Sequence, residues 1–351
     1  MSSSAARTFS DPDDYAAAIR NTKAEVTVTG RGQFSAKIIR IDLHRLSMQR
    51  FSDNLPRVGH SAGKSGRVII SFRTQPGPSL LWGGAEMLPT NIVRHGEGES
   101  TFQRSSGSAS WGAMSLPVEA ASALGETFAG CDLTPPYNAM LITPLPLAMA
   151  KLQRLHAAAG QLAEDAPEII AHPEAARGLE QALIEALVGC LGRGEVREDR
   201  SALRHHALIM RRFRRAVEEN PDQPLYIPEL CTTIGVADRT LRVCCQEQLG
   251  MSPRRYLLLR RMNLARRALR DSAPGMTTVT EIATQYGFWQ FGRFAGEYKS
   301  LFGETPSATL QRPRIGRGSE IRFSEFLPKV NSRTKDRPPN TEARATFAHS
   351  A

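Results

Sequence analysis

Apolar positions follow two different patterns along the chain, and the change lies near residue 146. Between residues 20 and 145, short apolar runs alternate with clusters of Gly, Pro and Ser, which is typical of short β-strands joined by turns. The expected strands are Glu25–Thr29, Ala36–Leu43, Arg67–Phe72, Leu80–Trp82 and Asn91–Arg94. Strands of this kind predict a small barrel or sandwich.

Beyond Pro146 the apolar residues recur at helical spacing. One helix is predicted from Leu147 to Leu162, and a second carries leucine at nearly every fourth position, at Leu179, Leu183, Leu187 and Leu191. This apolar stripe can pack on the β-rich part or on a second copy of the chain. The sequence leaves both alternatives open.

A polar and charged segment, Gly192–Ser201, predicts a linker to a third part that is helical. The first helix of this part is expected from Leu203 to Glu219, because Pro221 disfavours helix in the residue before it. After Pro313 the chain is rich in Arg, Pro and Ser, which predicts a mostly disordered tail.

The net charge of +10 is confined to the last part of the chain. Residues 1–204 hold 21 basic and 21 acidic side chains, residues 205–313 hold 16 and 10, and residues 314–351 hold 8 and 4. A basic C-terminal part beside a neutral N-terminal part favours a polyanion as partner, most simply nucleic acid.

The helical part contains an internal repeat. The segment Glu229–Val236 matches Glu281–Phe288, and Gly250–Pro253 matches Gly303–Pro306. Each copy is predicted to form a short helix, a turn at a glycine, a longer helix and a Gly-x-Ser/Thr-Pro end. This order is typical of a helix-turn-helix unit, and the sequence therefore predicts two such units.

Each longer helix has two faces of different chemistry. In the first copy the expected core stripe is Leu241, Cys245 and Leu249, and the other face shows Arg239, Arg242, Val243 and Gln246. In the second copy the core stripe is Phe294, Tyr298 and Leu301 with Phe302, and the other face shows Arg293, Gly296 and Lys299. Guanidinium and amide groups on one exposed helix face are suited to reading guanine and adenine edges in a major groove.

A long helix, expected from Ser252 to Asp271, separates the two copies. Its buried stripe is expected at Leu258, Met262, Ala265 and Leu269, and it bears Arg254, Arg255, Arg260, Arg261, Arg266, Arg267 and Arg270. A rigid spacer would let the two units reach adjacent major grooves, which lie about 34–36 Å apart on one face of DNA. The arginines can contact nucleic acid or form a solvated face, and Arg261 can be either a core ion-pair partner or a phosphate ligand.

Residues 208–312 resemble the AraC/XylS family of bacterial transcription regulators. The resemblance is carried by Ile234-Gly235-Val236, Arg239-Thr240-Leu241, Gly250-Met251-Ser252-Pro253, Ile282-Ala283, Tyr286-Gly287-Phe288, Arg293-Phe294, Tyr298-Lys299 and Phe302-Gly303-Glu304-Thr305-Pro306-Ser307. It implies an N-terminal domain that senses a small molecule or dimerises, and one monomer that reads two major-groove segments. The DNA contacts that it implies are Arg239, Thr240, Arg242, Val243, Gln246, Gln290, Phe291, Arg293 and Lys299.

Pattern and resemblance together predict an α+β multidomain protein. Residues 1–195 are expected to form a β-rich, barrel-like (cupin-like) domain with helices, which senses an effector or dimerises, and residues 196–202 a linker. Residues 203–313 are expected to form an all-α domain with two helix-turn-helix units, and residues 314–351 a basic, disordered tail.

The chain departs from the family pattern at the starts of both reading helices. In the first unit Ala237 stands at a cap position that is commonly Ser, and Asp238 is expected to cap the helix instead. In the second unit Trp289 takes the cap position, and Gly296 replaces a longer side chain. The second unit is therefore expected to position the protein on DNA more than to specify the sequence.

The remaining reactive residues point to few other kinds of site. Cysteines at positions 131, 190, 231, 244 and 245 show no paired spacing, which disfavours a disulfide scaffold and the common zinc patterns and fits a reducing cytoplasm. Adjacent Cys244 and Cys245 are interpreted as buried rather than redox-active. His44, His60 and His95 lack the close pairing of a metal site, so no metal or cofactor is expected. Trp82, His95 and Trp111 are candidates for an effector site.

The expected function is that of a bacterial, cytoplasmic, sequence-specific DNA-binding transcription regulator. No apolar run is long enough for a membrane span, and the polar, acidic N-terminus predicts no secretory signal. The expected partners are promoter DNA, RNA polymerase, a small-molecule effector and a second copy of the chain, and no catalytic residue is assigned. The alternatives are a DNA-repair alkyl transferase, which needs a reactive cysteine, and a non-specific architectural DNA-binding protein.

Overall fold

The computed structural model describes residues 2–125, 133–136, 139–192, 195–197, 201–220, 225–273 and 275–312. The described residues up to Arg312 belong to one compact unit. The predicted tail lies outside the described residues, as does Cys131. Among the helices that the structure describes, none is long and apolar enough to cross a membrane.

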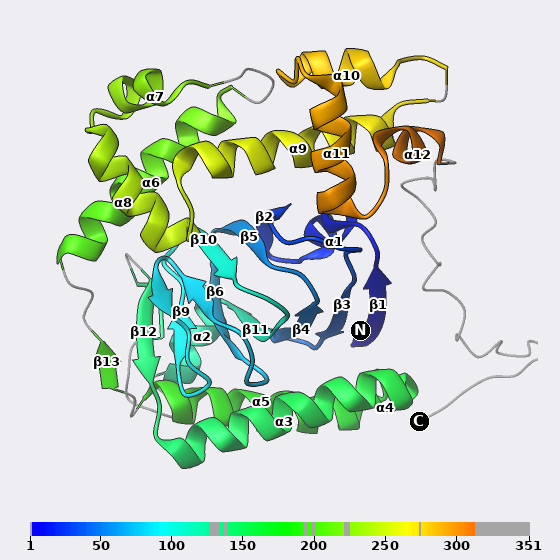
Figure 1. Cartoon of the computed structure of the whole chain (residues 1–351). Coiled ribbons are helices and arrows are strands. Elements are labelled where there is room, and N and C mark those ends of the chain that lie inside the picture. The colour runs from blue at the N-terminus through cyan, green and yellow to red at the C-terminus, as the bar shows by residue number, and fades with distance from the viewer. Residues whose placement is uncertain are drawn as a thin grey trace, which may run out of the picture. The chain divides into compact units, whose positions relative to one another are not determined.

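Two antiparallel sheets build the N-terminal part (Figure 1). The larger sheet has the order β1 (Ser3–Phe9), β3 (Ala36–Asp42), β4 (Ser47–Asp53), β11 (Ala109–Pro117), β6 (Arg67–Arg73), β9 (Ile92–Arg94), β12 (Met140–Thr143) and β13 (Glu195–Arg197). The smaller sheet has the order β2 (Thr22–Val28), β5 (Arg57–Gly63), β10 (Ser100–Ser105), β7 (Leu80–Trp82) and β8 (Ala85–Glu86). The five strands expected from the sequence are present as β2, β3, β6, β7 and β9.

The larger sheet is buried on both faces, because successive side chains of a strand point to opposite sides. In β3, Ile38 packs with residues of the smaller sheet, whereas Ile39 and Ile41 pack with the helices on the other side. In β11, Trp111 belongs to the core between the two sheets, and Met114 belongs to the core between the larger sheet and the helices. A short helix, α1 (Pro12–Ala18), adds its Tyr15 to the core between the sheets.

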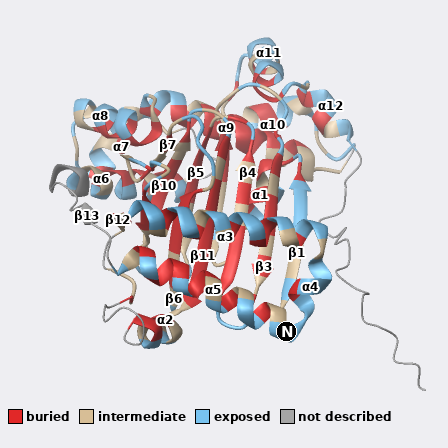
Figure 2. Cartoon of the chain, turned by 90° about the horizontal axis from the view of Figure 1, so that it is seen from below, coloured by how far each residue is buried: buried red, intermediate tan, exposed pale blue. Residues whose placement is uncertain are grey.

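Helices cover the outer face of the larger sheet (Figure 2). They are α3 (Pro146–Asp165), α4 (Pro167–Ala171) and α5 (Pro173–Leu191), and α2 (Val118–Leu124) follows β11. Leu183 and Leu187 of α5 are buried against the sheet, and Leu179 and Leu191 are partly buried at the edge of the same core. The leucine stripe is therefore part of the core of this chain, which answers the question that the sequence left open.

The C-terminal part is helical. It consists of α6 (Ser201–Glu218), α7 (Ile227–Ile234), α8 (Asp238–Leu249), α9 (Pro253–Asp271), α10 (Val279–Gln285), α11 (Phe291–Phe302) and α12 (Pro306–Gln311). One core joins α6, α7, α8 and the start of α9, and another joins the rest of α9 to α10 and α11. Helix α9 thus belongs to both cores and links the two helix pairs.

Glycine makes the turn in each helix pair. Gly235 after α7 has φ 70°, and Gly287 after α10 has φ 73°, a left-handed conformation that costs a side chain strain but costs glycine little. Each longer helix then ends at a left-handed glycine, Gly250 or Gly303. The hydroxyl of Ser252 caps α9, and Thr305 caps α12 in the same way.

Candidate nucleic-acid interface

The two faces of α8 separate as the sequence predicts. Leu241, Cys245 and Leu249 are fully buried, and the opposite face is exposed. The exposed side chains are Arg239, Arg242, Val243 and Gln246, with Thr240 half-buried beside them. Packing of the core stripe thus presents two guanidinium groups and one amide on a single surface of the helix.

The predicted cap of α8 is wrong. Ala237 is the N-cap residue, and no side chain accepts a hydrogen bond from the first turn. Asp238 lies one position inside the helix, where its carboxylate binds Arg242. The carboxylate still lies at the positive end of the helix dipole, so it contributes by charge and not by capping. Its hydrogen bond with Arg242 also raises the pKa of that guanidinium.

Helix α11 has the same division into two faces. Phe294, Tyr298, Leu301 and Phe302 are buried, and Arg293, Gly296 and Lys299 are exposed. Gln290 is the N-cap residue, so the prediction that Trp289 takes this position is wrong. Trp289 stands one residue before the cap with 71% of its surface exposed, and Phe291 is 42% exposed. The start of α11 therefore presents two aromatic rings to solvent.

The arginines of α9 fall into separate groups. Arg254 and Arg255, at the start of the helix, are exposed, whereas Arg260 and Arg266 are buried. Arg261 donates to the backbone carbonyls of Tyr286 and Gly287, at 3.3 and 3.4 Å. Through Nη1, Arg261 therefore binds the turn between α10 and α11, and its role as a phosphate ligand stays a prediction.

A groove of about 530 Å³ runs between the start of α9 and the start of α11. Its basic lining residues are Arg254, Arg255, Arg261 and Arg293, and Trp289 and Glu297 also line it. Four guanidinium groups against one carboxylate make the groove attractive to phosphate oxygens. Sequence reasoning missed this groove, because its walls come from two helices that the fold brings together.

The environment of Cys244 and Cys245 makes both thiols inert. Cys244 and Cys245 are fully buried, and burial raises the pKa of the Cys244 thiol to about 11 and that of Cys245 further. A thiol with a raised pKa holds little thiolate, the form that reacts. The interpretation of both as core residues is confirmed. Among the residues that the structure describes, no three His, Cys, Asp or Glu side chains cluster as a metal site would require.

A cavity lies between the two sheets of the N-terminal part, and all three effector candidates line it. The rings of Trp82 and Trp111 meet edge to face with centroids 5.8 Å apart, and His95 lies 4.8 Å from Trp82. Burial lowers the pKa of His95 to about 4, so its imidazole is neutral at pH 7 and bonds the Ser71 hydroxyl at 3.0 Å.

Several cavity residues could not be identified from the sequence. Tyr15, Phe51, Arg57 and His60 also line the cavity, from one helix and two strands. Arg57 forms a fully buried ion pair with Asp53, with Nε and Oδ2 2.9 Å apart. Within the described part of the chain, Arg57 Nη2 and Trp82 Nε1 are buried donors without a hydrogen-bond acceptor. The cavity thus combines flat apolar walls with unused donors.

Comparison with known proteins gives a family match in the C-terminal part and relatives that match a part of the chain. A family described as a helix-turn-helix domain matches residues 230–312. The chain is 36% identical over 151 residues to a probable thc operon regulatory protein of Rhodococcus erythropolis, which covers 42% of this chain and 45% of that protein. It is 34% identical over 99 residues to XylDLEGF operon transcriptional activator 3 of Pseudomonas putida, which covers 28% of this chain and 30% of that protein. The chain thus spans less than half the length of either relative.

Solved structures give two further likenesses. A probable AraC family transcriptional regulator from Rhodopseudomonas palustris CGA009 is 34% identical, and the match covers 30% of this chain and 97% of that chain with a TM-score of 0.28. ToxT from Vibrio cholerae O395 is 12% identical, and the match covers 83% of this chain and 98% of that chain with a TM-score of 0.26. Both TM-scores are low, so nothing about this chain follows from either superposition.

Proposed function

We propose that this chain, whose C-terminal domain belongs to the AraC/XylS family, is a sequence-specific DNA-binding transcription regulator in which each monomer reads two adjacent major-groove segments. The observation that carries the proposal is the pairing of α8 and α11. Each helix buries an apolar face and exposes arginine on the other, and α9 joins the two pairs. Such a module can place two reading helices on one face of DNA.

Each helix pair acts as a helix-turn-helix unit in this proposal. The first unit specifies sequence, because Arg239, Arg242 and Gln246 can form hydrogen bonds with base edges. The second unit mainly positions the protein, through Arg293, Lys299 and the basic groove beside α9. Exposed Phe291 and Gln290 lie at the start of α11, where they can reach the floor of the DNA major groove.

Residues 1–195 form the effector-sensing or dimerisation domain in this proposal, with a barrel-like (cupin-like) arrangement of its two sheets. The proposed linker, residues 196–202, includes the end of β13 and the start of α6. Residues 203–313 are the DNA-binding domain and residues 314–351 a basic tail. The cavity is the effector site. Its flat aromatic walls and the unused donors of Trp82 and Arg57 suit a flat apolar body with a hydrogen-bond acceptor, and the cavity, about 50 Å³ in this structure, must widen to admit such a molecule.

Promoter DNA, RNA polymerase and a second copy of the chain are the proposed partners, and the cytoplasm is the proposed location. The stripe at Leu183 and Leu187 is already buried within the chain, so a homodimer must use other surfaces of this domain. Leu145 and Leu147, at the start of α3, are exposed by 51% and 86% and are one such surface.

The enzyme alternative has no support from the described cysteines. An alkyl transferase needs a thiolate nucleophile, whereas burial raises the pKa values of Cys190, Cys244 and Cys245. The alternative of an architectural DNA-binding protein fits less well than a sequence-specific regulator. The exposed groups of α8 and α11 differ, and non-specific binding needs only phosphate contacts.

Selection of duplexes from a random pool, followed by footprinting, tests the proposed function. The full chain should enrich a common sequence and protect two segments that lie about one helical turn apart. A single protected segment would contradict reading by both units. Enrichment of no sequence at all would contradict the sequence-specific regulator and favour the architectural alternative.

A further inference from the structure

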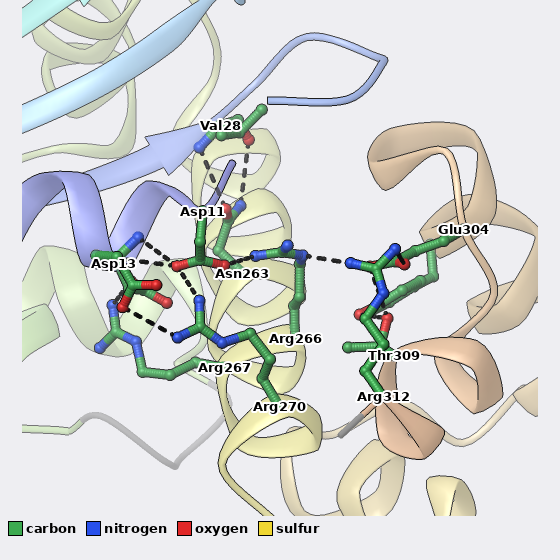
Figure 3. A network of polar contacts seen from close by, with 12 residues as sticks. Asp11, Asp13, Val28, Asn263, Arg266, Arg267, Arg270, Glu304, Thr309 and Arg312 are labelled. Carbon is green, nitrogen blue, oxygen red and sulfur yellow. Dashed lines mark hydrogen bonds and ion pairs between the residues drawn. The ribbon is translucent and has the colours of Figure 1, made fainter. Parts of the chain in front are cut away.

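An acidic surface of the N-terminal domain contacts the basic end of α9 (Figure 3). Asp11, Asp13 and Asp14 lie at the start of α1, and Arg266, Arg267 and Arg270 lie in the last turns of α9. Asp11 pairs with Arg266 and Arg270, Asp13 with Arg267, and Asp14 with Arg270. Asp11 and Arg266 are buried, with side chains 8% and 9% exposed. Buried and multiply paired charges hold their geometry better than isolated surface pairs do.

A neutral contact lies next to this cluster. The Val28 amide, at the end of β2, donates to Asn263 Oδ1 at 3.2 Å, and Asn263 Nδ2 donates to the Val28 carbonyl at 3.1 Å. Both groups are buried, so the two bonds replace the second strand neighbour that β2 lacks at the edge of the smaller sheet. This contact places α9 at a defined position along β2.

The same domain also contacts both helix pairs. Val58 and Phe102 belong to the core of the first pair, where Phe102 meets Tyr256 edge to face at 6.2 Å. At the second pair, the Gly32 amide donates to the Leu301 carbonyl at the end of α11, at 3.2 Å. One N-terminal domain therefore touches the first unit, α9 and the second unit.

None of these contacts involves the surfaces that would read DNA. Arg239, Arg242, Arg293 and Lys299 are exposed while the two domains are in contact. The contacts made by α11 lie at its C-terminal end, whereas Gln290 and Phe291 lie at its exposed start. The domain contact thus leaves the reading faces open and constrains how the two units lie relative to each other.

We propose that the N-terminal domain is a brace that sets the spacing between the two DNA-reading units, through the contact of Asp11, Asp13 and Asp14 with Arg266, Arg267 and Arg270. The proposal rests on the proposed function, because it presupposes that both units read DNA. Simultaneous binding of two linked sites is strong when the connection already matches their separation. The brace therefore determines which spacing between the two DNA segments the chain selects.

Two residues that line the cavity also contact helices of the DNA-binding part. Glu25 and His60 line the cavity, and they contact Arg260 of α9 and Arg214 of α6, respectively. A molecule that displaces either side chain changes a contact between the domains. Binding of the proposed effector in the cavity can therefore change the spacing between the two units.

The test is a full chain with Asp11→Asn, Asp13→Asn and Asp14→Asn. Asparagine caps helices as well as aspartate does, so α1 keeps its cap while the three charges are removed. No residue of the DNA-binding domain changes. The matched control is Glu168→Gln, Glu174→Gln and Glu185→Gln, which removes three exposed charges of the same domain far from α9.

The probes are the duplex that the wild-type chain selects from a random pool, the same duplex with one to five base pairs inserted between its segments, and a duplex with one segment alone. The aspartate variant should bind the two-segment duplex about tenfold more weakly and discriminate less between spacings. Its affinity for the single segment should stay within about twofold of wild type. The control variant should match wild type on all probes.

Unchanged affinity and spacing preference of the aspartate variant would overturn the proposal. Tighter binding would also overturn it, because the contact would then inhibit DNA binding. An equal loss on one and two segments would overturn it as well. Should the triple variant fail to fold, Asp14→Asn alone, at an exposed side chain, should give a smaller loss of the same kind.

Hydrogen exchange without DNA separates failure of the brace from failure of the proposed function. The amides of Val28 and Gly32 should exchange faster in the aspartate variant than in wild type, because both bonds cross the domain contact. A wild-type chain that selects no duplex refutes the proposed function even when this exchange result is obtained. Unchanged exchange refutes the brace even when DNA is read.

Discussion

Asp238 binds the Arg242 guanidinium at two points on the exposed face of α8, with Oδ1 accepting from Nε at 3.0 Å and Oδ2 accepting from Nη2 at 2.7 Å. On α11, Arg293 pairs with Glu297 through a single contact, with Nε donating to Oε1 at 2.8 Å. An arginine of each reading face is therefore oriented by a carboxylate of its own helix. The guanidinium of Arg242 keeps Nη1 for another acceptor.

Arg242→Ala should weaken binding to the selected duplex by about 1–3 kcal/mol, the range for a side chain that reads a guanine edge. The loss on random DNA should be much smaller, because Arg242 would specify the base rather than grip the backbone. Titrations with selected and scrambled duplexes measure the difference. Equal losses on both would mean that the first unit is not the specific reader.

Asp238→Asn should raise affinity for random DNA more than for the selected duplex. The substitution removes a negative charge that faces phosphates, but also the carboxylate that orients Arg242. Discrimination between selected and random DNA should therefore fall by about threefold to tenfold, within the range of about 0.5–1.5 kcal/mol for the net contribution of one hydrogen bond. Unchanged discrimination would show that Arg242 needs no orientation by Asp238.

Lys299→Ala should weaken binding to all duplexes alike. Lys299 is exposed on the last turn of α11, away from the start of the helix where base edges are reached. Loss of one phosphate contact should lower the slope of log affinity against log salt concentration by about one. Titration at several salt concentrations measures this slope, and a loss restricted to the selected duplex would assign Lys299 to base reading instead.

Asp53→Asn should lower the free energy of unfolding by about 3–5 kcal/mol, because it leaves the buried Arg57 charge without its partner. Denaturant unfolding monitored by tryptophan fluorescence measures this, since Trp111 lies in the same core. The double variant Asp53→Asn with Arg57→Met should recover part of the loss. Strictly additive losses in the double variant would contradict the assigned ion pair.

Acid should destabilise the N-terminal domain partly through His95. Burial lowers the folded-state pKa of His95 from 6.5 to about 4, so the unfolded chain binds a proton more readily in that interval. The contribution of neutral His95 to the free energy of unfolding is complete above pH 6.5. It is lost as the pH falls toward 4, at up to about 1.4 kcal/mol per pH unit. His95→Gln, which can still bond Ser71, should lose less stability across this interval. Identical pH profiles would contradict a neutral buried His95.

Local sequence patterns were enough to predict much of the C-terminal part. The glycine turns at Gly235 and Gly287 and the core stripes of α8 and α11 follow from patterns within about 25 residues, where helical period and turn chemistry act locally. The short strands of the N-terminal part were predicted for the same reason. The starts of α8 and α11 were not, because a cap position depends on backbone geometry at single residues and helix boundaries are weakly encoded.

Contacts between distant segments gave different environments to residues that the local patterns could not tell apart. Arg254 and Arg266 are the same kind of residue on one helix, yet Arg266 is buried against Asp11, which is 255 positions away in the chain. The leucine stripe of α5 packs against the larger sheet of the same chain. Trp82, His95 and Trp111 line one cavity because the two sheets stack. Burial and charge pairing depend on which distant segments come together, and neither helical period nor residue type within a short window carries that information.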